Sequence, residues 1–281
     1  MSDISCMGYN VLSYDTHFVG FEPAAVRFGY VLKTIDDNDP DLVGVQEACE
    51  EGSSKSGSAD FEWCGELIKA MAERGYGHSA LREQADFTLP KQTIACGLII
   101  FFKKDRFEMT DSGCKGYLHD PSRWFQWVKL TDKKFDRPIL FTNTHFSINP
   151  MLVDKHSGVA GDAYRTVEAT KLINFWNKEC PPDTALFATG DYNSVPTSPA
   201  QTLLRSKQFK PSVVVAKEYD EFGTTLGGRM GHSIDFCYVN PEAQEVDAYR
   251  VLRDRYPSDA DSRVAGYASD HRAIMTYTSY K

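Results

Sequence analysis

Eight short apolar runs recur along this chain of 281 residues and constrain its fold more than any other feature. Their lengths and their content of β-branched and aromatic residues are typical of β-strands. The runs occupy residues 4–12, 42–46, 94–102, 124–130, 139–144, 185–189, 234–239 and 273–278. This pattern predicts strands in both halves of the chain.

Four segments between these runs carry apolar residues at helical spacing. They occupy residues 24–35, 61–74, 164–180 and 198–205. In the first segment the predicted apolar stripe consists of Ala25, Phe28, Val31, Leu32 and Ile35. Helices in the first and third quarters of the chain favour two packed sheets flanked by helices over a wholly parallel sheet. No internal repeat or long linker appears, so we expect a single domain over residues 1–281.

Polar side chains that can do chemistry stand at the edges of six of these runs. In chain order they are Asn10, Glu47, His145, Asp191 with Asn193, Asp235, and Asp270 with His271. Each has an ordinary structural explanation when it is taken alone, because Asn and Asp are common turn and capping residues. Glu47 alone can be a solvated strand terminus, and His145 alone a hydrogen-bonded structural residue. The whole set is best explained by convergence on one cleft at one end of the sheets.

This inventory of residue types suits hydrolysis at phosphorus. Asp191 and Asn193 are two residues apart, so a base and an amide donor point to the same side of an extended segment. Asp270 and His271 add an anion and a titratable imidazole. Glu47 offers a carboxylate at the end of an apolar run, which is a ligand that Mg²⁺ accepts.

Arg123 is a further candidate, since it lies just before an aromatic run that begins at Trp124. Its guanidinium is placed to meet a phosphate through two parallel hydrogen bonds. The alternative is an exposed cation at a strand edge.

The charge balance bears on the class of substrate. A net charge of −8 argues against a protein that holds duplex DNA mainly through a broad basic surface. A nucleic-acid substrate is still compatible with this charge, because a bound divalent cation offsets local phosphate repulsion.

The location of the protein is predicted from what the sequence lacks. No apolar stretch approaches the roughly 20 residues that a membrane-spanning helix needs. The first residues lack the charged and apolar regions of a signal peptide, so we expect a cytoplasmic protein. The seven cysteines are scattered, which favours buried free thiols over a disulfide framework.

The ordered motifs resemble those of the endonuclease/exonuclease/phosphatase (deoxyribonuclease I-like) superfamily. The matching segments are Tyr9-Asn10-Val11-Leu12, Gln46-Glu47, Asn143-Thr144-His145, Gly190-Asp191-Tyr192-Asn193, Ile234-Asp235 and Ser269-Asp270-His271. They run from residue 9 to residue 271, which is nearly the whole chain. The resemblance implies a four-layer α/β sandwich, with two mixed β-sheets packed face to face and flanked by helices, and divalent-metal-dependent cleavage of a phosphate ester.

The resemblance also implies roles for individual residues. Glu47 is similar to the principal metal ligand, with Asn10 beside it and Asp270 close to the metal, which is expected to be Mg²⁺ with Mn²⁺ as a substitute. Asp191 is similar to the residue that orients or deprotonates the attacking water, and Asn193 to an amide donor to the phosphoryl oxygen. Asp235 and His271 resemble an acid–imidazole dyad. His145 matches the family's other active-site histidine.

The expected activity is therefore hydrolysis of a phosphodiester in a nucleic acid, single-stranded nucleic acid included, or in a nucleotide-like ester. One alternative is a phosphomonoesterase or a hydrolase of phospholipid or inositol headgroups. Another alternative is a binding module that keeps the fold, holds a phosphate ligand and has no turnover.

Overall fold

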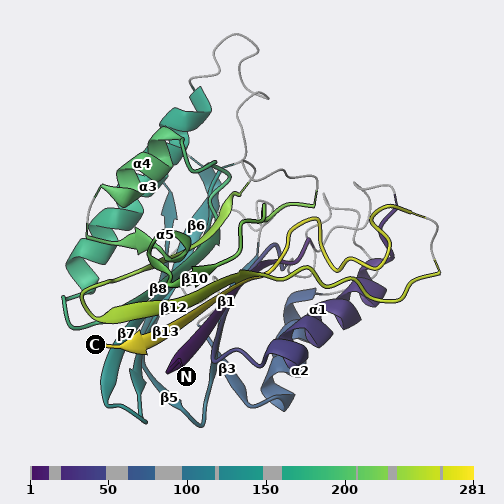
Figure 1. The fold of residues 1–281 in the computed structure, drawn as a ribbon, viewed down its shortest axis with the longest axis horizontal. Helices are drawn as coiled ribbons and strands as arrows, with labels where there is room; N and C mark the ends of the chain where they lie inside the picture. The colour runs from purple at the N-terminus through teal and green to yellow at the C-terminus, as the bar shows by residue number, and fades with distance from the viewer. Residues whose placement is uncertain are drawn as a thin grey trace.

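Two β-sheets packed face to face form the centre of the protein, and helices cover the outer face of each (Figure 1). The computed structural model describes residues 2–12, 20–48, 63–79, 97–117, 120–147, 160–206, 208–226, 233–259 and 262–281. The expected four-layer α/β sandwich is confirmed.

The first sheet has seven strands in the order β10-β12-β13-β1-β2-β4-β3. Their bounds are β1 (Ile4–Asn10), β2 (Leu42–Gln46), β3 (Tyr76–His78), β4 (Leu98–Lys103), β10 (Glu218–Tyr219), β12 (Gln244–Val251) and β13 (Ile274–Tyr280). The pairs β1·β2 and β10·β12 are parallel and the other pairs are antiparallel, so the sheet is mixed. Asn10 lies opposite Gln46 in the register, which brings the chain ends of β1 and β2 to the same edge.

The second sheet has six strands in the order β5-β6-β7-β8-β11-β9. Their bounds are β5 (Phe107–Tyr117), β6 (Asp120–Asp132), β7 (Arg137–His145), β8 (Ala185–Asp191), β9 (Lys210–Pro211) and β11 (Asp235–Val239). In the parallel pair β7·β8, His145 lies opposite Asp191. In the antiparallel pair β8·β11, Asp191 lies opposite Asp235. Three adjacent strands therefore present these three side chains side by side.

The helices lie on the two outer faces, as Figure 1 shows. Their bounds are α1 (Ala24–Asn38), α2 (Trp63–Glu73), α3 (Ala160–Glu179), α4 (Pro199–Arg205) and α5 (Ser212–Val215). Residues of α1 and α2 pack on the seven-stranded sheet, and residues of α3 and α4 pack on the six-stranded sheet. The start of α4 follows the sequence closely, because Ser198 Oγ accepts the Gln201 N–H and Pro199 occupies the first turn. All four predicted helices are present.

A buried polar cluster joins the two sheets just below the strand ends that carry the polar residues. Asn143 of β7 donates from Nδ2 to the carbonyl of Val45 at 2.7 Å, and its Oδ1 accepts from Gln46 Nε2 at 2.6 Å and from Thr189 Oγ1 at 3.2 Å. A Cβ atom at Gly44 would lie 2.0 Å from Thr189 Oγ1, so only glycine permits this approach. Apolar side chains fill the rest of the space between the sheets.

The eight predicted runs all contain strands; in the third the strand begins at Leu98, and residues 94–96 lie outside the described residues. The described cysteines, Cys6, Cys64, Cys114, Cys180 and Cys237, are all free, and all but the partly exposed Cys114 are the buried thiols that were predicted. Cys49 and Cys96 lie outside the described residues. Within the described ranges no helix has the length and apolar content needed to cross a membrane.

Candidate active site

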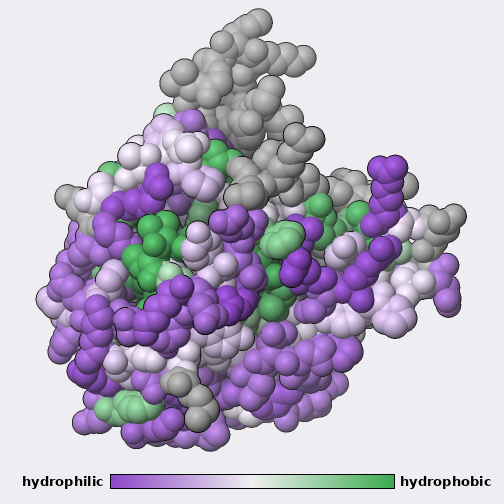
Figure 2. Space-filling model, in the orientation of Figure 1, coloured by the Kyte–Doolittle hydropathy of each residue, from purple (hydrophilic) through white to green (hydrophobic). Residues whose placement is uncertain are grey.

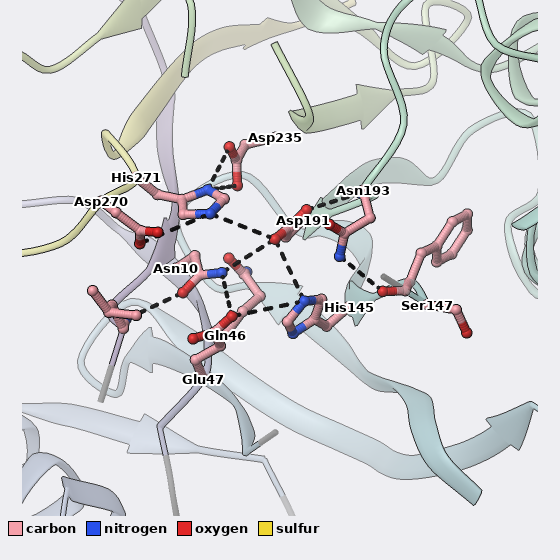
Figure 3. A network of polar contacts seen from close by, with 12 residues as sticks. Asn10, Gln46, Glu47, His145, Ser147, Asp191, Asn193, Asp235, Asp270 and His271 are labelled. Atoms are coloured by element: carbon pink, nitrogen blue, oxygen red, sulfur yellow. Dashed lines mark hydrogen bonds and ion pairs between the residues drawn. The ribbon is translucent and has the colours of Figure 1, made fainter. Parts of the chain in front are cut away.

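Polar side chains from both sheets meet at one end of the sandwich (Figure 3). All eight residues predicted at the strand edges are present in this group. Asn10, Glu47, Asp270 and His271 come from strand ends of the seven-stranded sheet, and His145, Asp191, Asn193 and Asp235 come from those of the six-stranded sheet. The predicted convergence of these side chains at one end of the sheets is therefore observed.

Asn10 links two carboxylates at the centre of the group. Its Nδ2 atom donates to Glu47 Oε1 at 3.0 Å and to Asp191 Oδ2 at 3.2 Å. Its Oδ1 atom accepts the backbone N–H of Leu12 at 3.1 Å, and this bond fixes the orientation of the amide. The two carboxylates are thereby held close together although they belong to different sheets.

The backbone at Glu47 adopts an uncommon conformation that directs its side chain into this group of polar residues. Its φ angle is +61°, which lies in the left-handed region that non-glycine residues rarely enter. The next residue, Ala48, is held by the carbonyl of Gly97, and a Cβ at Gly97 would lie 1.5 Å from the Ala48 carbonyl oxygen. Asn193 also has a positive φ, of +45°. Strained residues of this kind cluster at functional sites.

His145 is buried and uncharged. Burial lowers its pKa well below the usual value, and the positive charges of Arg123 and His271 lower it further. Its Nε2 atom lies 3.4 Å from Asp191 Oδ2 and 3.8 Å from Glu47 Oε1. Neither ring nitrogen has a hydrogen-bond partner among the described residues. A neutral imidazole therefore faces two carboxylates, and neither of its nitrogens has a hydrogen-bond partner. A bound cation would give one of these nitrogens a partner and would offset the charge of the carboxylates.

His271 and Asp235 form a close pair across the two sheets. The Nδ1 atom of His271 lies 2.9 and 3.1 Å from the two carboxylate oxygens of Asp235. Burial opposes a charge on the imidazole, but Asp235, Asp191 and Asp270 outweigh it and raise the pKa of His271 well above its usual value. The pair is therefore an imidazolium beside a carboxylate.

Asp191 lies between the two histidines. Its Oδ2 atom is 3.8 Å from His271 Nε2, and its Oδ1 atom accepts the backbone N–H of Asn193 at 2.8 Å. Burial raises the pKa of Asp191 to about 7, although the charge on His271 opposes the rise. The Asn193 side chain donates to the Phe146 carbonyl at 2.9 Å, which leaves its second amide hydrogen available.

Two groups of ligand atoms lie close enough together to hold a metal ion. Glu47, His145 and Asp191 form one, and Asp191, Asp235 and His271 form the other, with all ligand atoms of each group within 4.8 Å of one another. The donor set of the first group, two carboxylates and a neutral imidazole with no hydrogen-bond partner, fits a divalent cation.

Asp270 lies at the edge of this arrangement. Its side chain is partly exposed, and its Oδ1 atom is 4.0 Å from His271 Nε2. It belongs to neither group of ligand atoms within the described residues. Burial raises the pKa of Asp270, while the charge on His271 opposes the rise.

Arg123 is buried in β6 with 5% of its surface exposed, so the alternative of an exposed strand-edge cation is wrong. Its positive charge lowers the pKa of both Glu47 and His145, so it lies within electrostatic range of the first ligand group.

Two buried residues that support the site were not predicted. Arg27 of α1 is fully buried, and its guanidinium donates to the carbonyls of Leu12 at 2.6 Å and Ala268 at 3.0 Å, which flank the site loops. Glu168 of α3 accepts from the backbone N–H and the hydroxyl of Ser147. Arg27 could have been found from its spacing, because it lies four residues before Val31 on the same side of the helix. The buried face of α1 consists of Ala24, Arg27, Val31, Thr34 and Ile35.

The sequence and the structure both match known proteins. Residues 7–271 match the model of the Endonuclease/Exonuclease/phosphatase family. A search of curated proteins finds no match. Among solved structures, the chain is similar to the mannosyl-6-phosphatase Bt3783 of Bacteroides thetaiotaomicron VPI-5482, with 18% identity, a TM-score of 0.75 and coverage of 98% of this chain and 99% of that chain.

Two further solved structures share the fold. The human Nocturnin catalytic domain with bound sulfate anion has 17% identity and a TM-score of 0.70, over 100% of this chain and 94% of that chain. TDP2 of D. rerio, complexed with a single strand DNA product, has 14% identity and a TM-score of 0.66, over 98% of both chains. At these identities the likeness shows the fold alone.

Proposed function

This chain belongs to the endonuclease/exonuclease/phosphatase family of metal-dependent phosphoesterases, and we propose that it hydrolyses a phosphodiester by in-line attack of water. The observation that carries this proposal is the position of Asp191. Its two oxygens contact Asn10 and Asn193, and it lies between His145 with Glu47 on one side and His271 with Asp235 on the other. One carboxylate thus adjoins both a candidate cation site and a cationic donor.

The cation is proposed to be Mg²⁺, with Mn²⁺ as a substitute. Glu47 would hold it, with Asn10 orienting Glu47 and with Asp270 nearby, and His145 and Asp191 lie within reach of the same position. Mg²⁺ takes few protein carboxylates and leaves positions for substrate oxygens. When bound, it supplies positive charge that stabilises the charge developing on a phosphoryl oxygen.

The protein residues supply the remaining chemistry. Asp191 orients the attacking water and accepts its proton as the new P–O bond forms and the bond to the leaving oxygen breaks. The free amide hydrogen of Asn193 and the Nε2–H of His271 donate to the non-bridging oxygens. Asp235 maintains the imidazolium of His271. His145, which is uncharged, would offer the cation a neutral nitrogen ligand, and its Nε2 atom lies 3.4 Å from Asp191 Oδ2.

Arg123 is proposed to bind the substrate phosphate from the side of the first ligand group. It is buried within electrostatic range of that group and carries a permanent charge. A planar guanidinium can bond two phosphate oxygens at once, which both orients and neutralises the ester.

A nucleotide-like diester is favoured as substrate, with a phosphomonoester as the alternative. Proteins that share the fold include one described as a mannosyl-6-phosphatase and one bound to a DNA product, so the fold itself is compatible with both. The net charge of −8 favours a small ester over a long polyanion. A single catalytic domain over residues 1–281 and a cytoplasmic location stay predictions from the sequence.

The test compares hydrolysis of bis-p-nitrophenyl phosphate with that of p-nitrophenyl phosphate in Mg²⁺ or Mn²⁺, with EDTA as the control. The expected result is cation-dependent release of p-nitrophenol with a higher kcat/KM for the diester. Preference for the monoester would replace the diesterase with a phosphomonoesterase. If neither is cleaved, and Asp191→Asn leaves the affinity for inorganic phosphate unchanged, the protein is a phosphate-binding module.

A further inference from the structure

A pocket of about 210 Å³ is lined by residues of α5, β10, β11 and β12. Its apolar and aromatic walls come from Pro196, Val213, Tyr219, Phe222, Phe236 and Tyr249. Figure 2 shows hydrophobic atoms gathered over the position of α5, which contributes Val213. This pocket takes no part in the hydrolysis described above.

The pocket shares its backbone with the catalytic pair. Phe236, in its floor, follows Asp235 directly in β11. On the other side, the segment that continues from Phe222 reaches Thr224, whose hydroxyl accepts the Asp235 N–H at 3.2 Å. The next residue, Thr225, pairs with His271 in an isolated β-bridge. The charge of Asp235 also acts on Tyr249 in the pocket wall, so the pocket lies within electrostatic range of the catalytic pair.

Tyr249 brings a hydroxyl group to the wall of this pocket. Only 3% of the residue is exposed, so its ring is packed in the core while it still lines the pocket. Burial raises its pKa, and the charge of Asp235 raises it further, so the hydroxyl stays protonated. A phenolic hydroxyl both donates and accepts hydrogen bonds, so it suits a ligand with a polar edge.

Two exposed aromatic rings form the rim. Tyr219 and Phe222 are 52% and 45% exposed, although rings of this size are usually covered. The guanidinium of Arg253 lies 4.1 Å from the centre of the Phe222 ring and stacks on one face of this ring. Exposed rings beside a pocket are typical stacking surfaces for planar groups.

The size and charge of the pocket limit what it can hold. Its volume is below the roughly 300 Å³ at which pockets for drug-sized ligands begin, so it has room for one ring system. Asp220 and Glu221 also line it, and their negative charges disfavour a second phosphate there. An uncharged planar group with a polar edge meets all of these conditions.

We propose that this pocket binds an uncharged aromatic ring system, such as a nucleobase, that belongs to the same substrate as the scissile phosphate. The proposal rests on the proposed function and narrows the substrate to a nucleotide-sized ester. The protein would bind one ring and one phosphate of that ester.

The test measures binding by calorimetry in Mg²⁺, in an Asp191→Asn background so that no ligand is turned over. The probes are adenosine 5′-monophosphate, which carries a base, and ribose 5-phosphate, which does not. Stacking on one base is worth about 1–3 kcal/mol. Because about 1.4 kcal/mol corresponds to a tenfold change in Kd, the Kd of the nucleotide is expected to be at least about fivefold lower than that of ribose 5-phosphate.

Substitutions in the pocket test whether the tighter binding of the nucleotide arises there. Phe222→Ala and Tyr219→Ala are expected to remove most of the difference between the two probes, and Tyr249→Phe to reduce it while the fold is kept. The matched control is Phe135→Ala, since Phe135 is an exposed aromatic residue in the turn between β6 and β7, at the opposite end of β7 from His145. It is expected to leave both Kd values unchanged.

Equal Kd values for the two probes in the parent protein, or a preference that survives Phe222→Ala and Tyr249→Phe, would overturn the proposal. A 15-residue single-stranded oligonucleotide that binds over tenfold tighter than a dinucleotide would overturn the nucleotide-sized limit. These binding results are independent of the hydrolysis assay. Failure of the pocket proposal is therefore distinguishable from failure of the proposed function.

Discussion

Asn10 and Asp191 are 181 residues apart in the chain and belong to different sheets, yet the Asn10 amide nitrogen donates to Asp191 Oδ2 at 3.2 Å. The pair His271–Asp235 bridges the sheets in the same way, at 2.9 Å. The candidate active site therefore exists only when the two sheets are docked.

Asp191→Ala and His271→Ala are each expected to lower kcat by at least about 100-fold, because they remove a positioned base and a preorganised donor. The measurement is the steady-state rate on bis-p-nitrophenyl phosphate, with circular dichroism to confirm the fold. Asp36→Ala is the control, since Asp36 pairs with Arg74 on the surface. Near-wild-type rates for both site variants would remove these residues from the mechanism.

Glu47→Gln is expected to raise the Mg²⁺ concentration needed for half-maximal activity by about tenfold or more, because a neutral amide replaces the anionic ligand. A metal titration of the activity measures this, and calorimetry with Mn²⁺ checks it without turnover. Glu218→Gln, at an exposed carboxylate, is expected to change nothing. An unchanged titration for Glu47→Gln would exclude Glu47 as a ligand.

Glu47→Gly is expected to stabilise the metal-free protein. Glycine adopts the φ of +61° without strain, which is worth about 1 kcal/mol or more. The melting temperature in EDTA should rise by about 2 °C or more. Glu47→Ala is the matched control, because it removes the buried carboxylate but keeps the strained Cβ. If the Gly variant is no more stable than the Ala variant, backbone strain is not the cause.

Arg27→Met is expected to destabilise the protein by about 3 kcal/mol, because it leaves the carbonyls of Leu12 and Ala268 buried without donors. Urea unfolding measures the free energy of unfolding. Arg74→Met breaks an exposed ion pair and should cost under about 1 kcal/mol. Equal effects of the two substitutions would contradict a special role for Arg27.

Arg123→Met is expected to raise KM for the diester by about tenfold, because a charge-assisted hydrogen bond of about 1.5–3 kcal/mol is lost. Arg123→Lys should restore the charge but only part of the affinity, because an ammonium does not form the two-pronged contact. A change confined to kcat would instead assign Arg123 to the reacting atoms of the transition state.

The strands that carry the site were predictable because their apolar runs are buried on both faces. β2 and β8 are buried at every position, so a continuous apolar signal stops where the polar site residue begins. The ordered polar residues at these ends then identified the family. Tyr192, which separates Asp191 from Asn193, is fully buried and anchors this motif in the core.

Other parts of the fold were not predicted because their signal depends on neighbours. β5 is exposed over much of its length, and its Glu108, Thr110 and Asp111 resemble a loop until β6 pairs with it. Ala25 is exposed, and the predicted α1 stripe was displaced because Arg27 occupies the buried face. The aromatic pocket joins α5 and β10, which are neighbours in the chain, to the later strands β11 and β12, and none of these short elements carries a sequence signal for a pocket.

The close contact of Gly44 with Thr189 belongs to a part of the molecule that tolerates little substitution, unlike the surface around the aromatic pocket. No larger residue fits at Gly44, so the frame that aligns the hydrolytic groups leaves little freedom for mutation. The rim of the aromatic pocket, in contrast, comes from the short surface segment of residues 219–222. Exchanging that segment offers a route to retarget the enzyme to new esters while Thr224, Thr225 and the hydrolytic groups stay in place.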